Sequence, residues 1–320
     1  MNSIGIICAY FGKLPGCYDA WLKSCEYNQT IDFILVTDQS IDYRPKNVKV
    51  INMTFHDVQL LVNKQLKKNV ALDFPYKFCD LKPLYGVIFS EYLKQYEYWG
   101  HCDMDLVFGD LQYFLEKYDL QSYDKFLDLG HLSIYRNNEL SNNRFKEDGS
   151  LCGTWEEMIS SSRGFAFDER CGIYQIYKKN NYPQFDKRVY ADIAIIYRRF
   201  RCALDDINYD QQVFYWENGK VYRDYWINNI KHKEEFMYIH FKQRKFKRPD
   251  FDLNNSNAFY IGPTGYTDKL SESQIEIVNK INPFHGKTYE KKELLIFKIK
   301  DLKRRIMKKT NNLIKKEGID

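Results

Sequence analysis

The start of the chain alternates between apolar runs and a helical segment, and this order restricts the fold more than any other feature of the sequence. Ser3 to Tyr10 predicts a buried strand, Tyr18 to Glu26 a helix, and Asp32 to Thr37 a second strand. This order indicates a parallel α/β sheet, because parallel neighbours need a crossover connection. Ligands of such sheets bind beyond the carboxyl ends of the strands, where Tyr10, Phe11 and Asp38 fall.

Later segments continue the α/β pattern. The expected strands are Val48–Met53, Tyr98–Phe108, Leu127–Tyr135 and Met237–Phe241, and the expected helices are Val58–Val70 and Lys82–Tyr96. Asn218-Gly219 separates two aromatic-rich runs and predicts a β-hairpin. We therefore expect one α/β domain over residues 1–286, with a mixed sheet flanked by helices, followed by a helical tail over residues 287–320.

The positive charge of the chain is concentrated in this tail. Twelve of the 48 Lys and Arg and five of the 43 Asp and Glu lie in residues 287–320, so the tail carries +7 and the rest of the chain −2. A near-neutral body argues against a nucleic-acid-binding fold and indicates an electrostatic tail. No stretch approaches the ~20 apolar residues that span a bilayer.

The cysteines bear on the compartment. Eight cysteines are scattered through the chain without a C-x-x-C pair, which disfavours both structural zinc and a secreted disulfide framework. Reduced thiols and the lack of a basic region before the first apolar run predict a cytoplasmic protein.

Asp103-Met104-Asp105 is the first candidate for chemistry. Period-two alternation within the expected strand would place His101, Asp103 and Asp105 on one face. Two carboxylates at this spacing can hold a divalent cation, which stabilises negative charge on a diphosphate leaving group. The alternative is a pair of solvated acids at a strand end. The apolar run before them favours the metal, since burying unpartnered carboxylates is costly.

A histidine followed by basic residues is the second candidate. His240 ends the run Tyr238-Ile239-His240-Phe241, and five basic residues follow: Lys242, Arg244, Lys245, Lys247 and Arg248. Imidazole is a common ligand of manganese-like ions, and basic side chains bind diphosphate oxygens. The alternative is a solvated basic loop.

With these motifs the chain resembles the GT-A glycosyltransferases. The resemblance points in particular to a bacterial glycosyltransferase-like family of capsule and lipopolysaccharide gene clusters, and more distantly to glycosyltransferase families 8 and 32. It covers roughly residues 3 to 248 and is carried by the segments Ile6–Gly12, Val36–Asp38, Lys77–Pro83, Trp99–Asp105, Gly130–Leu132, Phe167–Glu169 and Tyr238–Phe241. It implies a GT-A (Rossmann-like) fold and transfer of a sugar from a nucleotide-sugar donor.

The resemblance also assigns roles to single residues. Asp103, Asp105 and His240 would bind Mn²⁺ or Mg²⁺, with Asp103 also at the ribose. Ala9, Tyr10, Phe11 and Asp38 would hold the nucleotide, and Lys82 would reach the donor. In family 8 a Gly and then Lys-Pro-Trp follow the histidine, whereas this chain lacks the Gly and has Phe246 at the lysine position. The diphosphate contact is therefore assigned to Lys245, with Arg244 and Lys247 as the alternatives.

Asp168 and Glu169 are the candidates for chemistry on the acceptor. Inverting transfer needs a carboxylate to take the proton of the acceptor hydroxyl, whereas retaining transfer can proceed without an enzymic base. Either acid could instead cap a helix. His131 is expected to be a hydrogen-bonded histidine at a strand end rather than a catalyst.

Three function classes follow. The first is metal-dependent transfer of a sugar, from a donor that is expected to be UDP-linked, to a saccharide or lipid-linked saccharide in surface polysaccharide synthesis. The second is a sugar-phosphate nucleotidyltransferase, which the poor loop Gly12–Gly16 disfavours because that class uses a Gly-rich, basic phosphate loop. The third is a non-catalytic carbohydrate- or membrane-binding protein.

The tail predicts contact with a membrane. Leu295, Ile299, Leu302, Ile306 and Leu313 recur at helical spacing, bordered by Lys303, Arg304, Arg305, Lys308 and Lys309. This pattern is typical of an interfacial helix on an anionic surface, here the inner face of the cell membrane. The alternative is an apolar seam that packs on the body or on a second copy.

Overall fold

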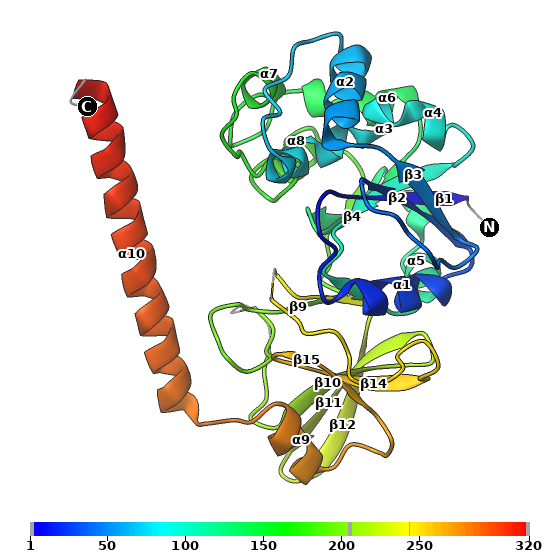
Figure 1. Ribbon diagram of the computed structural model, residues 1–320, viewed down its shortest axis with the longest axis vertical. Coiled ribbons are helices and arrows are strands. Elements are labelled where there is room, and N and C mark those ends of the chain that lie inside the picture. The colour runs from blue at the N-terminus through cyan, green and yellow to red at the C-terminus, as the bar shows by residue number, and fades with distance from the viewer. Residues whose placement is uncertain (1–2, 204–206, 243, 318–320) are drawn as a thin grey trace.

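The computed structural model describes residues 3–203, 207–242 and 244–317 (Figure 1). The amino-terminal half builds a sheet covered by helices, the carboxyl-terminal half builds smaller sheets, and one long helix follows (Figure 1).

The main sheet has seven strands in the order β3-β2-β1-β4-β7-β6-β8. Its strands are β1 (Ile4–Tyr10), β2 (Ile31–Thr37), β3 (Val48–Asn52), β4 (Tyr98–Cys102), β6 (Lys125–Leu129), β7 (Leu132–Arg136) and β8 (Gln184–Phe185). β3, β2, β1 and β4 run parallel, and β7 is antiparallel to both β4 and β6. β1 and β2, in the middle of the parallel part, are almost continuously apolar, as expected for strands that are buried on both faces.

Helices cover both faces of this sheet. On one face Ile6 and Cys8 of β1 pack with α1 (Tyr18–Glu26) and α5 (Leu111–Lys117). On the other face Ile7 packs with α2 (Phe55–Leu66). The remaining short helices before β8 are η1 (Pro75–Leu84), α3 (Tyr85–Ile88), α4 (Ser90–Leu93), η2 (Leu120–Ser122), α6 (Glu139–Asn143), η3 (Arg144–Lys146), α7 (Trp155–Ile159) and α8 (Ile173–Lys179).

Two further sheets complete the body. An antiparallel sheet has the order β12-β11-β10-β14-β15, and a three-stranded sheet has the order β5-β13-β9. Their strands are β5 (Leu106–Phe108), β9 (Ala191–Asp192), β10 (Gln212–Glu217), β11 (Lys220–Ile227), β12 (Ile230–Phe236), β13 (Tyr238–His240), β14 (Ala258–Gly262) and β15 (Gly265–Asp268). α9 (Ile275–Ile281) packs on the five-stranded sheet through Val278.

The expected fold class is confirmed, since a mixed sheet lies between helices and a long helix ends the described part of the chain. The expected helix Tyr18–Glu26 is observed with the same bounds. The expected hairpin joins β10 and β11, and Asn218 and Gly219 both have positive φ values (48° and 82°), as a type I′ turn requires.

Three expected elements are wrong in detail. Leu127–Tyr135 is not one strand, because it spans parts of β6 and β7, which pair antiparallel to each other. Tyr98–Phe108 is not one strand, because β4 pairs with β1 and β7 whereas β5 pairs with β13 in another sheet. Asp103 to Asp105 form the turn between them, and His101, which is fully buried beside Tyr85 and Tyr135, does not share a face with the two acids. Lys82–Tyr96 is not one helix but the end of η1 followed by α3 and α4.

The last helix, α10 (Lys287–Glu317), extends away from the body for most of its length (Figure 1). Its first turns are attached to the body. Glu290 forms an ion pair with Arg201 and lies 3.4 Å from Nη1 of Arg199, and Oε1 of Glu293 accepts a hydrogen bond of 3.2 Å from the backbone N–H of Arg198. Among the described helices, none is both long and apolar enough to cross a bilayer. The side chains of Arg305, Lys308, Lys309 and Leu313, which the sequence places in the amphipathic pattern, lie outside the described part of the chain.

Candidate metal and nucleotide site

The two acids of the turn after β4 meet His240 because two distant segments pair. In the antiparallel β5–β13 ladder Leu106 lies opposite His240, and the backbone N–H of Phe241 donates a hydrogen bond of 2.9 Å to the carbonyl of Asp105. The backbone N–H of Asp103 donates to the carbonyl of His131 at 2.9 Å, which fixes the other end of the turn. One ligand atom from each of Asp103, Asp105 and His240 lies within 4.8 Å of the others.

The charges around His240 fit a divalent cation. Its Nε2 lies 3.5 Å from Oδ1 of Asp105, and its Nδ1 lies 2.9 Å from Oδ1 of Asp192. Burial alone would lower the pKa of His240, but Asp105 and Asp192 outweigh burial and raise the pKa to about 9. A position between carboxylates that favours a positive charge on imidazole also favours a cation beside its neutral form. Two carboxylates and one imidazole form a donor set that suits Mn²⁺ and related ions.

Lys82 connects this site to the acceptor-side candidates. Its Nζ lies 2.5 Å from Oδ1 of Asp103 and 3.2 Å from Oδ2 of Asp168, and it donates a hydrogen bond of 2.9 Å to the carbonyl of Gly130. Burial would lower the pKa of Lys82, but Asp103 in particular raises it well above its ordinary value. Lys82 is therefore a buried, charged bridge between the two groups of carboxylates.

The loop that carries Asp168 is held from η1. Oδ2 of Asp80 accepts a hydrogen bond of 2.9 Å from the backbone N–H of Phe165, and Oδ1 accepts one of 3.1 Å from Phe167. Nζ of Lys77 lies 2.9 Å from Oδ2 of Asp80, and both side chains are buried. The Lys77–Pro83 segment thus holds the Phe167–Glu169 loop in two ways. Asp80 binds the backbone N–H group of Phe167 at the start of the loop, and Lys82 pairs with the side chain of Asp168.

The two acids of this loop differ from ordinary surface carboxylates. Burial, which Lys82 partly offsets, raises the pKa of Asp168 to about 7, and burial also raises the pKa of Glu169. A Cβ on Gly130 would collide with Oδ2 of Asp168, so only glycine allows this close approach. Both acids precede α8, whose N-cap residue is Gly172, so neither occupies the helix-cap position that was the alternative for them.

The residues expected to hold the nucleotide lie at or just beyond the carboxyl ends of β1 and β2. Ile7 of β1 lies beside His101 of β4 in the parallel ladder, so Ala9 and Tyr10 lie at the same edge of the sheet as the Asp103–Asp105 turn. Burial raises the pKa of the Tyr10 hydroxyl, and the negative charges that contribute include Asp105.

The loop after Tyr10 is also ordered. Oδ1 of Asp38 accepts hydrogen bonds from Nε2 of Gln39 at 2.8 Å and from the backbone N–H of Gly12 at 2.9 Å, and these contacts hold the pKa of Asp38 below its ordinary value. The Phe11 ring packs edge-on against Phe55, with 5.4 Å between the ring centroids. Asp38 therefore closes the loop that follows β1.

The residues of the basic run after His240 differ in their contacts. Lys245 is exposed, whereas Arg244 donates hydrogen bonds of 2.7 Å to the carbonyls of Ala194 and Tyr197 and so has a structural role. Phe246 is buried, and its carbonyl lies so close to Gly16 that a Cβ on this glycine would collide with it. Lys242 forms an ion pair beside the site, since its Nζ lies 2.5 Å from Oδ2 of Asp192.

Sequence reasoning missed Asp192. This acid lies beside His240 in the parallel β9–β13 ladder and is buried, with a side chain that is 4% exposed. Its one sequence signal was a single carboxylate within the otherwise apolar segment Tyr190–Ile196. His131 also lies closer to the site than expected, since its ring centroid is 4.3 Å from that of His240.

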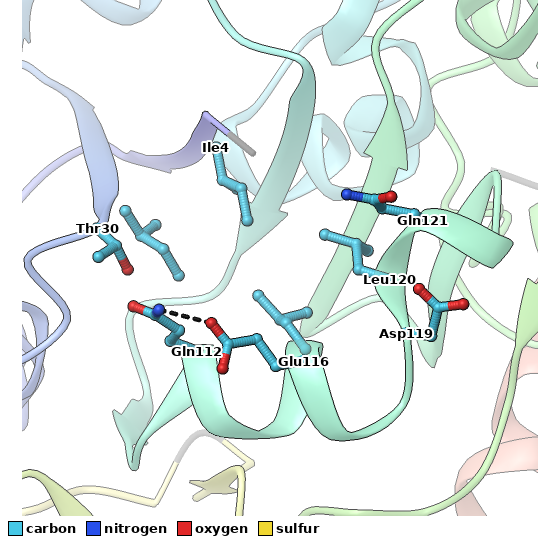
Figure 2. A pocket seen from close by; sticks show the side chains of 9 residues that line it. Ile4, Thr30, Gln112, Glu116, Asp119, Leu120 and Gln121 are labelled. Carbon is cyan, nitrogen blue, oxygen red and sulfur yellow. Dashed lines mark hydrogen bonds between the residues drawn. The ribbon is translucent and has the colours of Figure 1, made fainter. Parts of the chain in front are cut away.

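A pocket of about 420 Å³ lies elsewhere, near the amino ends of β1 and β2 (Figure 2). Figure 2 shows Gln112 and Glu116 in its wall, and Nε2 of Gln112 donates a hydrogen bond of 2.7 Å to Oε1 of Glu116. This pocket is at the opposite edge of the sheet from the Asp103–Asp105 turn and contains none of the candidate residues.

Several solved structures resemble the chain. They include mouse xyloside xylosyltransferase 1 in its apo form (9% identity, TM-score 0.39, covering 59% of this chain and 87% of that one) and the galactosyltransferase LgtC in complex with donor and acceptor sugar analogues (11% identity, TM-score 0.34, covering 59% and 75%). An active-site mutant of LgtC has 10% identity and a TM-score of 0.36, covering 59% and 74%. No match was found among curated proteins. Residues 6–270 match the profile described as "Family of unknown function (DUF6625)", and the chain therefore belongs to this family.

Proposed function

We propose that the protein is a metal-dependent glycosyltransferase that transfers a sugar from a nucleotide-sugar donor. The observation that carries this proposal is the convergence of Asp103, Asp105 and His240, whose ligand atoms lie within 4.8 Å of one another near the carboxyl ends of the parallel strands β1 and β4. We propose a UDP-linked donor, a saccharide or lipid-linked saccharide acceptor, and a role in capsule or lipopolysaccharide synthesis on the cytoplasmic side.

In the reaction the bond between the anomeric carbon and the diphosphate oxygen breaks, and its electron pair leaves with the nucleoside diphosphate. The acceptor oxygen forms the new bond to the anomeric carbon and loses its proton. Mn²⁺ or Mg²⁺ held by Asp103, Asp105 and His240 would supply positive charge for the departing diphosphate. Ala9, Tyr10, Phe11 and Asp38 would hold the nucleotide.

Asp168 and Glu169 are the proposed groups on the acceptor side. Lys82 lies between Asp103 and Asp168, so it can orient both the donor side and the acceptor side. In an inverting transfer Asp168 or Glu169 takes the acceptor proton, and in a retaining transfer the two acids position the acceptor hydroxyl. We retain Lys245 as the proposed diphosphate contact.

Donor hydrolysis tests this proposal. A panel of nucleotide-sugars is incubated with the protein with and without Mn²⁺, and released nucleoside diphosphate is measured. We expect slow, Mn²⁺-dependent hydrolysis that Asp105→Ala abolishes while its circular dichroism spectrum is unchanged, whereas the exposed control Asp42→Ala keeps wild-type turnover.

Binding of a nucleotide-sugar without any turnover would instead indicate a non-catalytic protein. Metal-dependent release of pyrophosphate from a nucleoside triphosphate and a sugar phosphate would indicate a nucleotidyltransferase.

We also propose that α10 attaches the enzyme to an anionic membrane surface. Leu295, Ile299 and Leu302 have exposed fractions of 58%, 47% and 59%, and they share one side of the helix at about 100° per residue. Glu290 and Glu293, which contact the body, fall on the opposite side. The body contacts of α10 therefore leave this apolar seam uncovered, which weighs against the alternative that it packs on the body.

The charges beside the seam favour a membrane over a second copy. Lys291 and Lys298 border the seam on one side, and Lys292 and Lys303 on the other, at the same helical spacing. Two seams packed together would bring these lysines close to one another, which is repulsive. An anionic lipid surface pairs with them, and each basic group near such a surface contributes about 1 kcal/mol.

A further inference from the structure

His240 is held between two carboxylates, one at each ring nitrogen. Nε2 faces Asp105 at 3.5 Å, and Nδ1 lies at hydrogen-bond distance, 2.9 Å, from Oδ1 of Asp192. Asp105 belongs to the proposed metal site, whereas Asp192 faces the nitrogen on the other side of the ring. A histidine that binds a metal through one nitrogen commonly donates its other N–H to such a carboxylate.

The backbone fixes Asp192 in this place. His240 and Asp192 are direct neighbours in the parallel β13–β9 ladder, where the N–H of Ile193 donates to the carbonyl of His240 at 3.0 Å. The N–H of Ala203 donates to the carbonyl of Asp192 at 2.8 Å. Asp192 thus belongs to a paired strand, and backbone hydrogen bonds on both sides hold it beside His240.

A third contact restrains the imidazole ring of His240. The ring centroid of His131 lies 4.3 Å from that of His240, and Nδ1 of His131 lies 3.0 Å from the hydroxyl of Tyr238. Tyr238 in turn stacks on Tyr190, with 5.0 Å between the ring centroids. With one ring face covered and Nδ1 bonded, Nε2 is the nitrogen that remains directed at Asp105.

Asp192 and His131 could themselves form a metal site with His240, since one ligand atom of each lies within 4.8 Å of the others. The charges argue against this reading. Nζ of Lys242 already lies 2.5 Å from Oδ2 of Asp192, and Oδ1 faces Nδ1 of His240, so both oxygens of the carboxylate are engaged. An ion at this triad would face the lysine ammonium and would have to displace the Nδ1 hydrogen bond.

We propose that Asp192 is the positioning residue of the metal ligand His240. It accepts a hydrogen bond from the Nδ1–H group, so that Nε2 carries no proton when a metal is bound and would face the ion that Asp103 and Asp105 share. This inference rests on the proposed metal site, and it adds a residue that contacts neither the ion nor the donor.

The test measures Mn²⁺ affinity and not turnover. Free Mn²⁺ is counted by its paramagnetic resonance signal during titration of the full chain in the presence of UDP. We expect Asp192→Asn to weaken Mn²⁺ binding by about 10- to 100-fold, the usual effect of removing a partner of a metal-binding histidine. The exposed control Asp186→Asn should bind Mn²⁺ like the wild type.

Two further variants distinguish a wrong metal site from a wrong role for Asp192. His240→Ala tests the metal site itself, because unchanged Mn²⁺ affinity in this variant would contradict the ligand role on which the inference rests. Wild-type affinity in Asp192→Asn, together with weakened binding in His240→Ala, would overturn the role of Asp192 alone. Lys242→Gln removes the other partner of Asp192 and should change Mn²⁺ affinity by less than about 3-fold, since Nδ1 keeps its carboxylate. A loss equal to that of Asp192→Asn would mean that the whole cluster acts structurally.

Circular dichroism checks that each variant is folded. If Asp192→Asn does not fold, Asp192→Glu takes its place, because the added methylene moves the carboxylate relative to Nδ1. This variant should also bind Mn²⁺ several-fold more weakly, and unchanged affinity would equally overturn the proposal.

Discussion

Asp105 and His240 come from segments that are remote in sequence, and their contact at 3.5 Å depends on the pairing of two three-residue strands. A ligand that is one of three contributes to affinity without supplying all of it. The effect of losing His240 should therefore differ from the effect of losing a proton-transfer group.

We predict that His240→Ala raises the Mn²⁺ concentration needed for half-maximal donor hydrolysis, and that excess Mn²⁺ partly restores turnover. The physical reason is that Asp103 and Asp105 still bind the ion, more weakly. Initial rates over a Mn²⁺ titration measure this, with the exposed His56→Ala as control. An unchanged metal requirement would show that His240 has a structural role.

Burial raises the pKa of Asp168 to about 7, so we expect the rate of sugar transfer to depend on pH. Below pH 7 the carboxyl is protonated and cannot accept a proton, so transfer in an inverting reaction should rise as the pH increases through about 7. Asp168→Asn should lower transfer by about 10²-fold or more and remove this rise, while nucleotide binding persists. Glu169→Gln is the parallel variant. Retention of full transfer in both would place the base elsewhere or indicate a retaining reaction.

At the scale of elements, η1 acts as a clamp on the loop of Phe167 to Glu169. Asp80 accepts hydrogen bonds from the backbone N–H groups of Phe165 and Phe167, and it pairs with Lys77, whose side chain is fully buried. Removing one partner of a buried pair leaves an uncompensated charge, which costs more than loss of an exposed pair.

We predict that Asp80→Ala lowers the free energy of unfolding by about 3 to 5 kcal/mol. Urea denaturation followed by tryptophan fluorescence measures the loss. The matched control is Glu91→Ala, which removes an ion pair to Lys94 whose side chains are 74% and 72% exposed, and which should leave the unfolding midpoint unchanged. Equal midpoints for wild type and Asp80→Ala would contradict the proposed clamp.

In the whole molecule, α10 leaves an exposed apolar seam of Leu295, Ile299 and Leu302 beside its basic residues. The segment 287–320 carries +7 in a chain whose remaining charge is −2, and its first turns contact the body through glutamates. The body is thus held at one end of a basic amphipathic helix.

We predict that the triple variant Leu295→Glu, Ile299→Glu and Leu302→Glu loses binding to vesicles that contain anionic phospholipid, while donor hydrolysis in solution is retained. Vesicle co-sedimentation at low and high salt measures binding, which should weaken as salt increases. The matched control changes three exposed leucines of the body to Glu: Leu140, Leu151 and Leu270, with exposed fractions of 77%, 74% and 88%. If the wild-type protein does not bind anionic vesicles even at low salt, the membrane proposal is wrong. If the triple variant changes only the oligomeric state, the seam packs between copies.

Several local elements of this protein could be predicted from the amino-acid order alone, because periodicity and turn chemistry act over a few residues. The first strand and helix, the Asn218-Gly219 hairpin and the final helix all follow from such short-range signals. The same signals mark Asp103, Asp105 and His240 as polar groups at the ends of apolar runs.

How these groups meet depends on contacts between segments that are distant in the sequence. Alternation along a single strand predicted that His101 shares a face with the two acids. This prediction fails because β4 pairs with β1, whereas β5 pairs with β13 in another sheet. Asp192 lies 48 residues before His240, and Lys82 lies 21 residues before Asp103. Their contacts depend on strand pairing and on burial of charge against charge, which no short stretch of sequence encodes.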